Sequence, residues 1–169
     1  MNALQKHISA GTKTAQLINI IGFQLCWAAC VIGGNIWALL CVFLFMLWHW
    51  TQRKPGELKL IILLTLTGTL FDSILMHLGV LLFPSHGGVV IPLWLILLWC
   101  SFAATLRHSL AWLLQRPLLA SVLAAISAPW SYYAGSLFDA VSLTYPALPV
   151  IAVAWAVLLG FISVNSRGK

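Results

Sequence analysis

Two ionisable residues, Asp72 and Arg107, occur in apolar surroundings where side chains of their type can do chemistry. Asp72 lies inside the apolar run from 58 to 83. If this run crosses a membrane as a helix, a carboxylate there costs ~2.5 kcal/mol or more, so it needs protein around it and a partner. Small and polar residues share the helical face of Asp72: Thr65, Gly68, Thr69 and Gly79. We therefore expect this face to pack toward the interior of the protein.

Arg107 is the predicted counter-charge of Asp72. Its own helical face carries small residues, namely Cys100, Ala103, Ala104 and Ala111. At a helical rise of about 1.5 Å per residue, the two side chains start about 8 Å apart in depth, which an extended arginine and a tilted helix can bridge. We predict that a polar binding site forms from five residues: Gln24, Asp72, Arg107, His108 and Tyr132.

In this predicted site, Arg107 together with His108 holds the anionic head group of a ligand, and Asp72 orients Arg107. Gln24 and Tyr132 form hydrogen bonds with the ligand. Two alternatives remain open. Asp72 and Arg107 can simply fasten two helices together, or the fourth helix can end near Leu106 and leave Arg107 and His108 as cations at the membrane interface.

No catalytic residue can be assigned from a motif. The sequence contains no GxSxG, no Walker-type glycine-rich loop and no dinucleotide-binding fingerprint. His77, His86 and Asp139 are expected near one surface, but no pair of histidines or carboxylates has the helical spacing of metal ligands. We expect neither a metal nor a cofactor. His49, between Trp48 and Trp50, is interpreted as an interfacial residue.

The composition indicates which solvent surrounds these residues. Of the 169 residues, 62% are hydrophobic and 7% are charged, whereas a soluble domain carries roughly 25% charged residues. A chain with so few charges needs an apolar exterior solvent, so we expect an all-α integral membrane protein. Its basic residues stand singly between apolar runs, without a patch that could follow a phosphate backbone, which excludes a nucleic-acid-binding protein.

Turn residues divide the chain into apolar segments long enough for transmembrane helices. Gly33-Gly34, Pro55-Gly56 and Arg116-Pro117 mark three of the divisions. We predict one membrane domain, residues 1–169, built as a bundle of six transmembrane helices. Their expected ranges are 15–33, 36–50, 58–83, 89–115, 117–138 and 146–164.

The positions of the basic residues predict the orientation of this bundle. With six crossings, all nine Lys and Arg residues fall on the side of the two termini. The three links on the other side, 33–35, 84–88 and 139–145, contain neither Lys nor Arg. Because Lys and Arg hold loops on the cytoplasmic side, we expect both termini in the cytoplasm.

Several segments together carry a resemblance to a known family. They are Asn19-x-x-Gly22-Phe23-Gln24-x-x-Trp27, Asp72, the segments 92–99 and 105–114, and Pro129-Trp130-Ser131-Tyr132. The chain resembles, over nearly its whole length, a bacterial family catalogued as domain of unknown function 2878. The resemblance implies a protein of the bacterial inner membrane and brings no established activity. It also implies an association with fatty-acid-modifying enzymes, such as cyclopropane-synthase-like proteins.

The predicted function follows from the polar site in an apolar bundle. We expect a binding, export or accessory component that handles an apolar or amphipathic small molecule, such as a lipid or fatty-acyl group, linked to membrane lipid modification. One alternative is an integral-membrane enzyme acting on lipids, with Asp72 or His108 as acid or base. A second is a structural subunit of a membrane complex. The sequence leaves open whether another membrane protein or a second copy of the chain is a partner.

Overall fold

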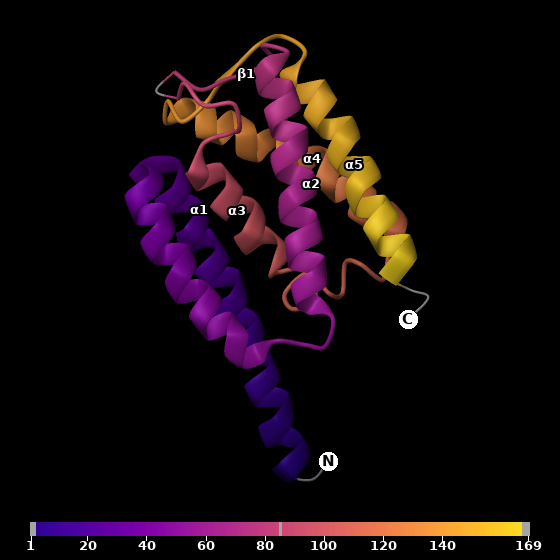
Figure 1. Cartoon of the computed structure of the whole chain (residues 1–169). Helices are drawn as coiled ribbons and strands as arrows, with labels where there is room; N and C mark the ends of the chain where they lie inside the picture. Colours follow the sequence, from indigo (N-terminus) through magenta and orange to yellow (C-terminus); the bar gives the residue numbers. More distant parts are fainter. Residues whose placement is uncertain (1–2, 85, 167–169) are drawn as a thin grey trace.

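The computed structural model of the chain describes residues 3–84 and 86–166 and is built from helices (Figure 1). The helices are α1 (Ala3–Gln52), α2 (Glu57–His77), α3 (Leu93–Ala103), α4 (Pro117–Leu137) and α5 (Ala147–Ser166). Two short strands, β1 (Leu81–Leu82) and β2 (Ser142–Leu143), pair in antiparallel fashion. The predicted all-helical fold is confirmed, and the described residues form five helices where six were expected.

The helix α1 contains two helical stretches that meet at Gly34. This residue has φ 66° and ψ −160°, a backbone conformation that glycine adopts more readily than other residues. The chain reverses there, and the second stretch runs back beside the first (Figure 1). Gly22 of the first stretch faces the ring of Phe45 in the second so closely that a β-carbon would collide with it. The two stretches contain the predicted helices 15–33 and 36–50, and the first stretch begins earlier than predicted, at Ala3.

The other helix boundaries match the predictions with two exceptions. Helices α4 and α5 begin within one residue of the predicted starts. For α4 the start was marked by Pro117, which occupies its first turn. Helix α2 ends at His77, before the predicted end at 83, because Gly79 takes a left-handed conformation with φ 70°. The following residues then pair as β1.

The second exception is the predicted helix 89–115, which begins later than predicted, at Leu93 after Pro92, and is wrong in its second half. Helix α3 ends at Ala103, and the chain continues to residue 115 in successive turns. Asn19 of α1 explains why these turns persist, because its side chain donates to the Ala104 carbonyl at 3.4 Å and accepts from Ser109 Oγ at 2.6 Å. Within the turns, the backbone N–H of His108 donates to the Thr105 carbonyl at 3.0 Å. Non-helical backbone is tolerated in such a protein where its polar groups are bonded within the protein.

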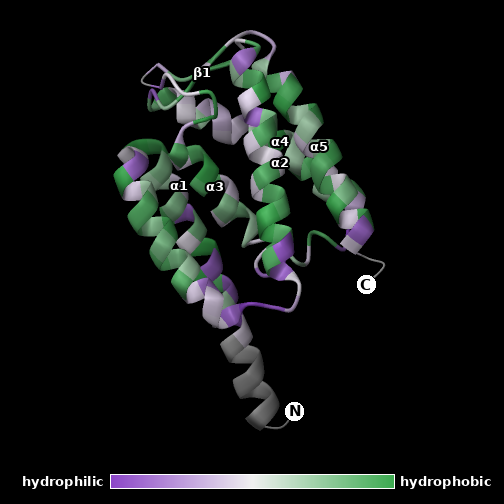
Figure 2. Cartoon of the chain, viewed as in Figure 1, coloured by the Kyte–Doolittle hydropathy of each residue, from purple (hydrophilic) through white to green (hydrophobic). Residues whose placement is uncertain are grey.

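The links between the helices gather at two ends of the bundle (Figure 1). At one end, Trp94 N donates to Asn35 Oδ1 at 3.0 Å, and β1 pairs with β2. At the other, which we call the basic end, the link 53–56 contacts the turns 104–116, since Arg107 Nη1 donates to the Pro55 carbonyl at 2.6 Å. The hydrophobic residues lie mostly along the helices between these ends (Figure 2).

Large apolar side chains cover much of the outer surface. Leu66 and Leu70 of α2 and Val153 and Val157 of α5 are each more than 60% exposed. Three helical segments among the described residues are long and apolar enough to cross a membrane, namely Thr12–Gln52, Glu57–His77 and Ala147–Ser166. Helix α3 is apolar but shorter. It packs between α1 and α2, and α4 packs against α5.

Candidate functional site

Asp72 is fully buried and receives its hydrogen bonds from two aromatic side chains. Trp99 Nε1 of α3 donates to Asp72 Oδ2 at 2.7 Å. The Tyr132 hydroxyl of α4 lies 2.8 Å from Oδ1 and 2.7 Å from Oδ2. Gly68, one turn earlier on α2, leaves the room that the Trp99 indole occupies. The predicted inward orientation of this face of α2 is confirmed, because Gly68 and Asp72 are both buried.

A cavity of about 400 Å³ lies beside this arrangement. It is bounded by residues of α1, α3, α4 and α5, and aromatic side chains form much of its wall: Phe23, Trp27, Trp99, Phe102, Trp130, Tyr132 and Trp155. Polar groups are few, and they include Gln24, Ser127 and Ser131. A largely apolar cavity with a few polar groups is typical of a small-molecule binding site.

Ring stacking and hydrogen bonds hold the aromatic wall together. The rings of Trp99 and Trp155 stack with their centroids 4.7 Å apart, and Phe102 meets Trp155 edge-on at 5.0 Å. Trp27 Nε1 of α1 donates to Ser131 Oγ of α4 at 2.9 Å across the cavity region. The wall is therefore built from contacts between side chains of different helices.

The structure brings three of the five predicted site residues together. Gln24 and Tyr132 both line the cavity, and Asp72 lies directly behind Tyr132. Arg107 and His108 do not line it. The predicted pairing of Asp72 with Arg107 is wrong, because α3 ends at Ala103 and the turns carry Arg107 to the basic end.

Arg107 and His108 take different roles at the basic end. Arg107 Nη1 donates to the Pro55 carbonyl, and the Lys54 ammonium group donates to the Arg107 carbonyl. For Arg107, the structure thus matches the alternative in which the helix ends early and this side chain stays near the bundle end. His108 differs, because it is 9% exposed and its Nε2 lies 3.0 Å from Glu57 Oε1.

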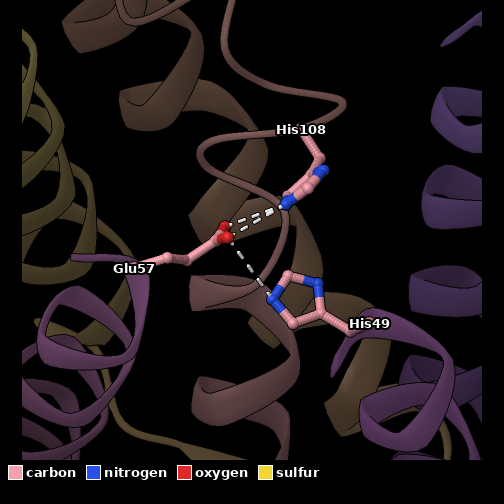
Figure 3. Close-up of side chains that lie close together, drawn as sticks. All are labelled: His49, Glu57 and His108. Carbon is pink, nitrogen blue, oxygen red and sulfur yellow. Dashed lines mark hydrogen bonds and ion pairs between the residues drawn. The ribbon is translucent and has the colours of Figure 1, made fainter. Parts of the chain in front are cut away.

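Glu57 and His49 complete a cluster with His108 that the sequence did not reveal (Figure 3). His49 Nε2 lies 3.8 Å from Glu57 Oε2. His49, interpreted from the sequence as an interfacial residue, lies in the last turn of α1 and is buried inside the protein, since it is 1% exposed. One atom from each residue lies within 4.8 Å of the others, and this is the one group of three possible metal ligands found among the described residues. One signal in the sequence could have pointed to this cluster. Glu57 is one of three acidic residues in the chain, so a partner for its carboxylate could have been sought.

The histidines expected to lie near Asp139 are separate from this cluster. His77 Nε2 lies 2.7 Å from the Val89 carbonyl, and His86 Nε2 lies 2.6 Å from the Val90 carbonyl. Both imidazoles thus contact backbone in the link before α3, where they fasten the chain. Among the described residues, neither of these two histidines belongs to a group of three possible metal ligands.

Comparison with known proteins gives a family and no further relatives. A family model described as "Protein of unknown function (DUF2878)" matches residues 16–161. This range includes every residue of the cavity and of the cluster at the basic end. No curated protein and no solved structure matches the chain.

Proposed function

The chain belongs to the DUF2878 family of proteins of unknown function, and from that premise we propose that it binds an apolar or amphipathic small molecule, such as a lipid or fatty-acyl group. The binding site is the aromatic cavity. The observation that carries this proposal is the cavity of about 400 Å³, whose wall is mainly aromatic and whose polar groups are few. Such a lining gains free energy from apolar contact and uses its polar groups to orient the ligand.

The position of the cavity supports an apolar ligand taken from the membrane. Gln24, Ser127 and Trp130 line the cavity and are themselves exposed on the outer surface of the helices. The cavity therefore opens sideways between α1 and α4, toward the apolar solvent that surrounds the bundle. An acyl chain can enter from there without crossing water, and Gln24 is placed to bond a polar group of the ligand near the opening.

Asp72 acts in this proposal as a positioning residue. It is 0% exposed and is absent from the cavity wall, while Tyr132 and Trp99 stand between it and the cavity. By accepting their hydrogen bonds, Asp72 fixes the orientation of two rings that the ligand touches. This arrangement favours binding over the alternative of a lipid-modifying enzyme in which Asp72 is the acid or base, because such a group must reach the substrate.

The proposal includes a membrane topology. We place the chain in the bacterial inner membrane with six crossings, counting the two stretches of α1 and the shorter α3 separately, and with both termini in the cytoplasm. The support is the basic end, which contains Arg53, Lys54, Arg107 and Arg116, together with the absence of Lys and Arg from the links 78–92 and 138–146. In this setting the protein serves as a binding or export component beside enzymes that modify membrane lipids.

Filling the cavity tests the binding proposal. Ser127→Trp places an indole in the cavity, whereas Ile126→Trp adds the same group at a neighbouring position that is 65% exposed. The probe is a C16 fatty acid with a photoreactive diazirine, cross-linked to the full chain purified in detergent. We expect labelling in Ser127→Trp to fall about tenfold, equal to 1.4 kcal/mol of binding, and to stay unchanged in Ile126→Trp.

Labelled peptides identify the site in the unsubstituted chain, and they should come from segments that line the cavity. Equal labelling of the two variants, or labels confined to the outward faces of α2, would overturn the proposal. Arg107→Ala provides a further comparison. Since Arg107 does not line the cavity, its replacement should leave the labelling unchanged.

A further inference from the structure

We propose that His49, Glu57 and His108 bind one first-row divalent transition-metal ion, with Zn²⁺ as the reference ion, at the basic end of the bundle (Figure 3). The three side chains come from separate segments: His49 from the end of α1, Glu57 from the start of α2 and His108 from the turns after α3. Figure 3 shows that both imidazoles point toward the Glu57 carboxylate. This site lies apart from the aromatic cavity, and the proposal does not depend on the binding function given above.

The donor set has the chemistry of a zinc-type site. Two neutral imidazoles and one carboxylate occur in catalytic zinc sites and in the facial triad of iron(II) enzymes, each with an open position for water. Ligand bonds of about 2.0–2.1 Å to a tetrahedral ion place the ligand atoms about 3.3 Å apart. His108 Nε2 lies 3.0 Å from Glu57 Oε1, and His49 Nε2 lies 3.8 Å from Oε2. The three ligand atoms all lie within 4.8 Å of one another, and side-chain rotations that draw the two imidazoles together around the carboxylate produce this geometry.

His49 distinguishes a metal site from an ordinary buried ion pair. Neither of its ring nitrogens has a hydrogen-bond partner in the described structure, although the side chain is 1% exposed. At 3.8 Å, its Nε2 is too far from Glu57 to form a hydrogen bond. An unsatisfied buried polar group costs about 1–3 kcal/mol, so each one needs an explanation. A bound cation supplies the missing partner, whereas a simple pair of His108 with Glu57 leaves His49 unexplained.

Backbone contacts around the cluster hold the carboxylate in place. Lys54 N donates to Glu57 Oε2 at 2.8 Å, which restricts the orientation of the carboxylate. The contact of Arg107 with the Pro55 carbonyl joins the link before Glu57 to the turns that carry His108. Hydrogen bonds of this kind to metal ligands raise the affinity of a site because they orient the ligands before the ion arrives. The Phe45 ring lies beside His49, with the two ring centroids 6.3 Å apart.

The proposal can be tested with the full chain purified in detergent, freed of any histidine tag and stripped with a chelator. We expect equilibrium dialysis against Zn²⁺, followed by elemental analysis, to give one bound zinc per chain. His49→Ala and His108→Ala should each lower the zinc affinity at least about tenfold. The matched control is His77→Ala, which removes a histidine whose Nε2 contacts the Val89 carbonyl in another part of the chain. This control should retain the zinc, and Mg²⁺ should not compete for the site.

A second measurement on the unsubstituted chain keeps the test decisive if a variant fails to fold. Co²⁺ replaces zinc in such sites, and four-coordinate Co²⁺ gives strong visible absorption bands. We expect these bands to appear with Co²⁺ and to disappear when Zn²⁺ is added. A Co²⁺ spectrum that stays that of the aqueous ion, or zinc binding that is equal in the unsubstituted chain and in His49→Ala, would show that the cluster is an ion pair without a metal.

Discussion

Asp72 and Glu57 are two fully buried carboxylates of the same helix, and they differ in how completely the polar groups around them are hydrogen-bonded. Asp72 has Trp99 and Tyr132 as hydrogen-bond donors, so that both of its oxygens are bonded. Glu57 lies beside two imidazoles, one of which has neither nitrogen bonded in the described structure. Protein atoms alone satisfy the hydrogen bonds around Asp72, whereas within the described part of the chain they leave the His49 imidazole beside Glu57 without a hydrogen bond.

This difference separates a positioning role from a ligand-binding role. A buried polar group that is fully bonded makes the surrounding side chains rigid. A buried group left unbonded by protein atoms calls for another partner, such as a water molecule or an ion, because native proteins bond nearly all such groups. We infer that Asp72 shapes the wall of a cavity and that Glu57 belongs to a site that is itself occupied. Three predictions test the Asp72 side of this comparison through protein stability, from the largest effect to the smallest.

The largest effect is expected from Asp72→Leu. This change leaves the Trp99 N–H and the Tyr132 hydroxyl without an acceptor, and we expect it to lower the free energy of unfolding by about 3 kcal/mol. Asp72→Asn is the matched control, because an amide of the same shape can still accept from Trp99 and bond to Tyr132. It should cost about 1 kcal/mol or less.

Thermal unfolding of the two variants in the same detergent measures this difference. If the Asn variant is destabilised as strongly as the Leu variant, then the negative charge of Asp72 is needed, and a cation must lie near it. That outcome would contradict the assignment of Trp99 and Tyr132 as its sufficient partners.

A smaller effect is expected from Gly68→Ala. A β-carbon at this position would overlap the Trp99 indole, so the ring must move away from Asp72, at a cost of about 2 kcal/mol. Gly135→Ala is the control in α4, where the added carbon would lie 3.6 Å from Val141 in an ordinary contact. There the better helix propensity of alanine should raise stability by up to about 1 kcal/mol.

Unfolding measurements read out the stability, and near-ultraviolet circular dichroism reads out the environment of the tryptophans. The Ala variant at position 68 should change the tryptophan signal, and the one at 135 should not. Equal stability of both variants would mean that Trp99 does not depend on Gly68 for its place beside Asp72.

Much of the fold was predictable because the relevant signals are local. Apolar runs of sufficient length, divided by residues such as Gly34 and Pro117, indicated most of the helical segments. The inward face of α2 was predictable because Gly68 and Asp72 fall on one side of a helix whose outward face carries large apolar residues such as Leu66 and Leu70. A buried carboxylate needs such a face, so periodicity alone located one part of the candidate site.

The end of α3 and the cluster at the basic end were not predictable, because both depend on contacts between distant segments. The sequence from 93 to 115 contains neither glycine nor proline, and the turns after Ala103 are bonded by Asn19, which is 85 residues away from Ala104. The same turns bring His108 to Glu57, 51 residues apart in the chain. A helix extended through this region places Arg107 near Asp72, which is how the incorrect pairing arose.

The smallest effect is expected from Arg107, and a double-mutant cycle shows whether the two carboxylates of α2 have separate partners. Arg107→Ala removes the hydrogen bond to the Pro55 carbonyl and should cost about 1 kcal/mol. Since Arg107 and Asp72 share no partner, the costs of Arg107→Ala and Asp72→Asn should add within about 0.5 kcal/mol. Breaking a buried Asp–Arg pair would instead cost about 3–5 kcal/mol for either change.

The control cycle combines His108→Ala with Glu57→Gln, whose side chains are 3.0 Å apart. The costs of these two changes should be non-additive by about 1 kcal/mol or more. A non-additive result for Arg107 with Asp72 and an additive one for His108 with Glu57 would reverse the assignment of partners to the two carboxylates.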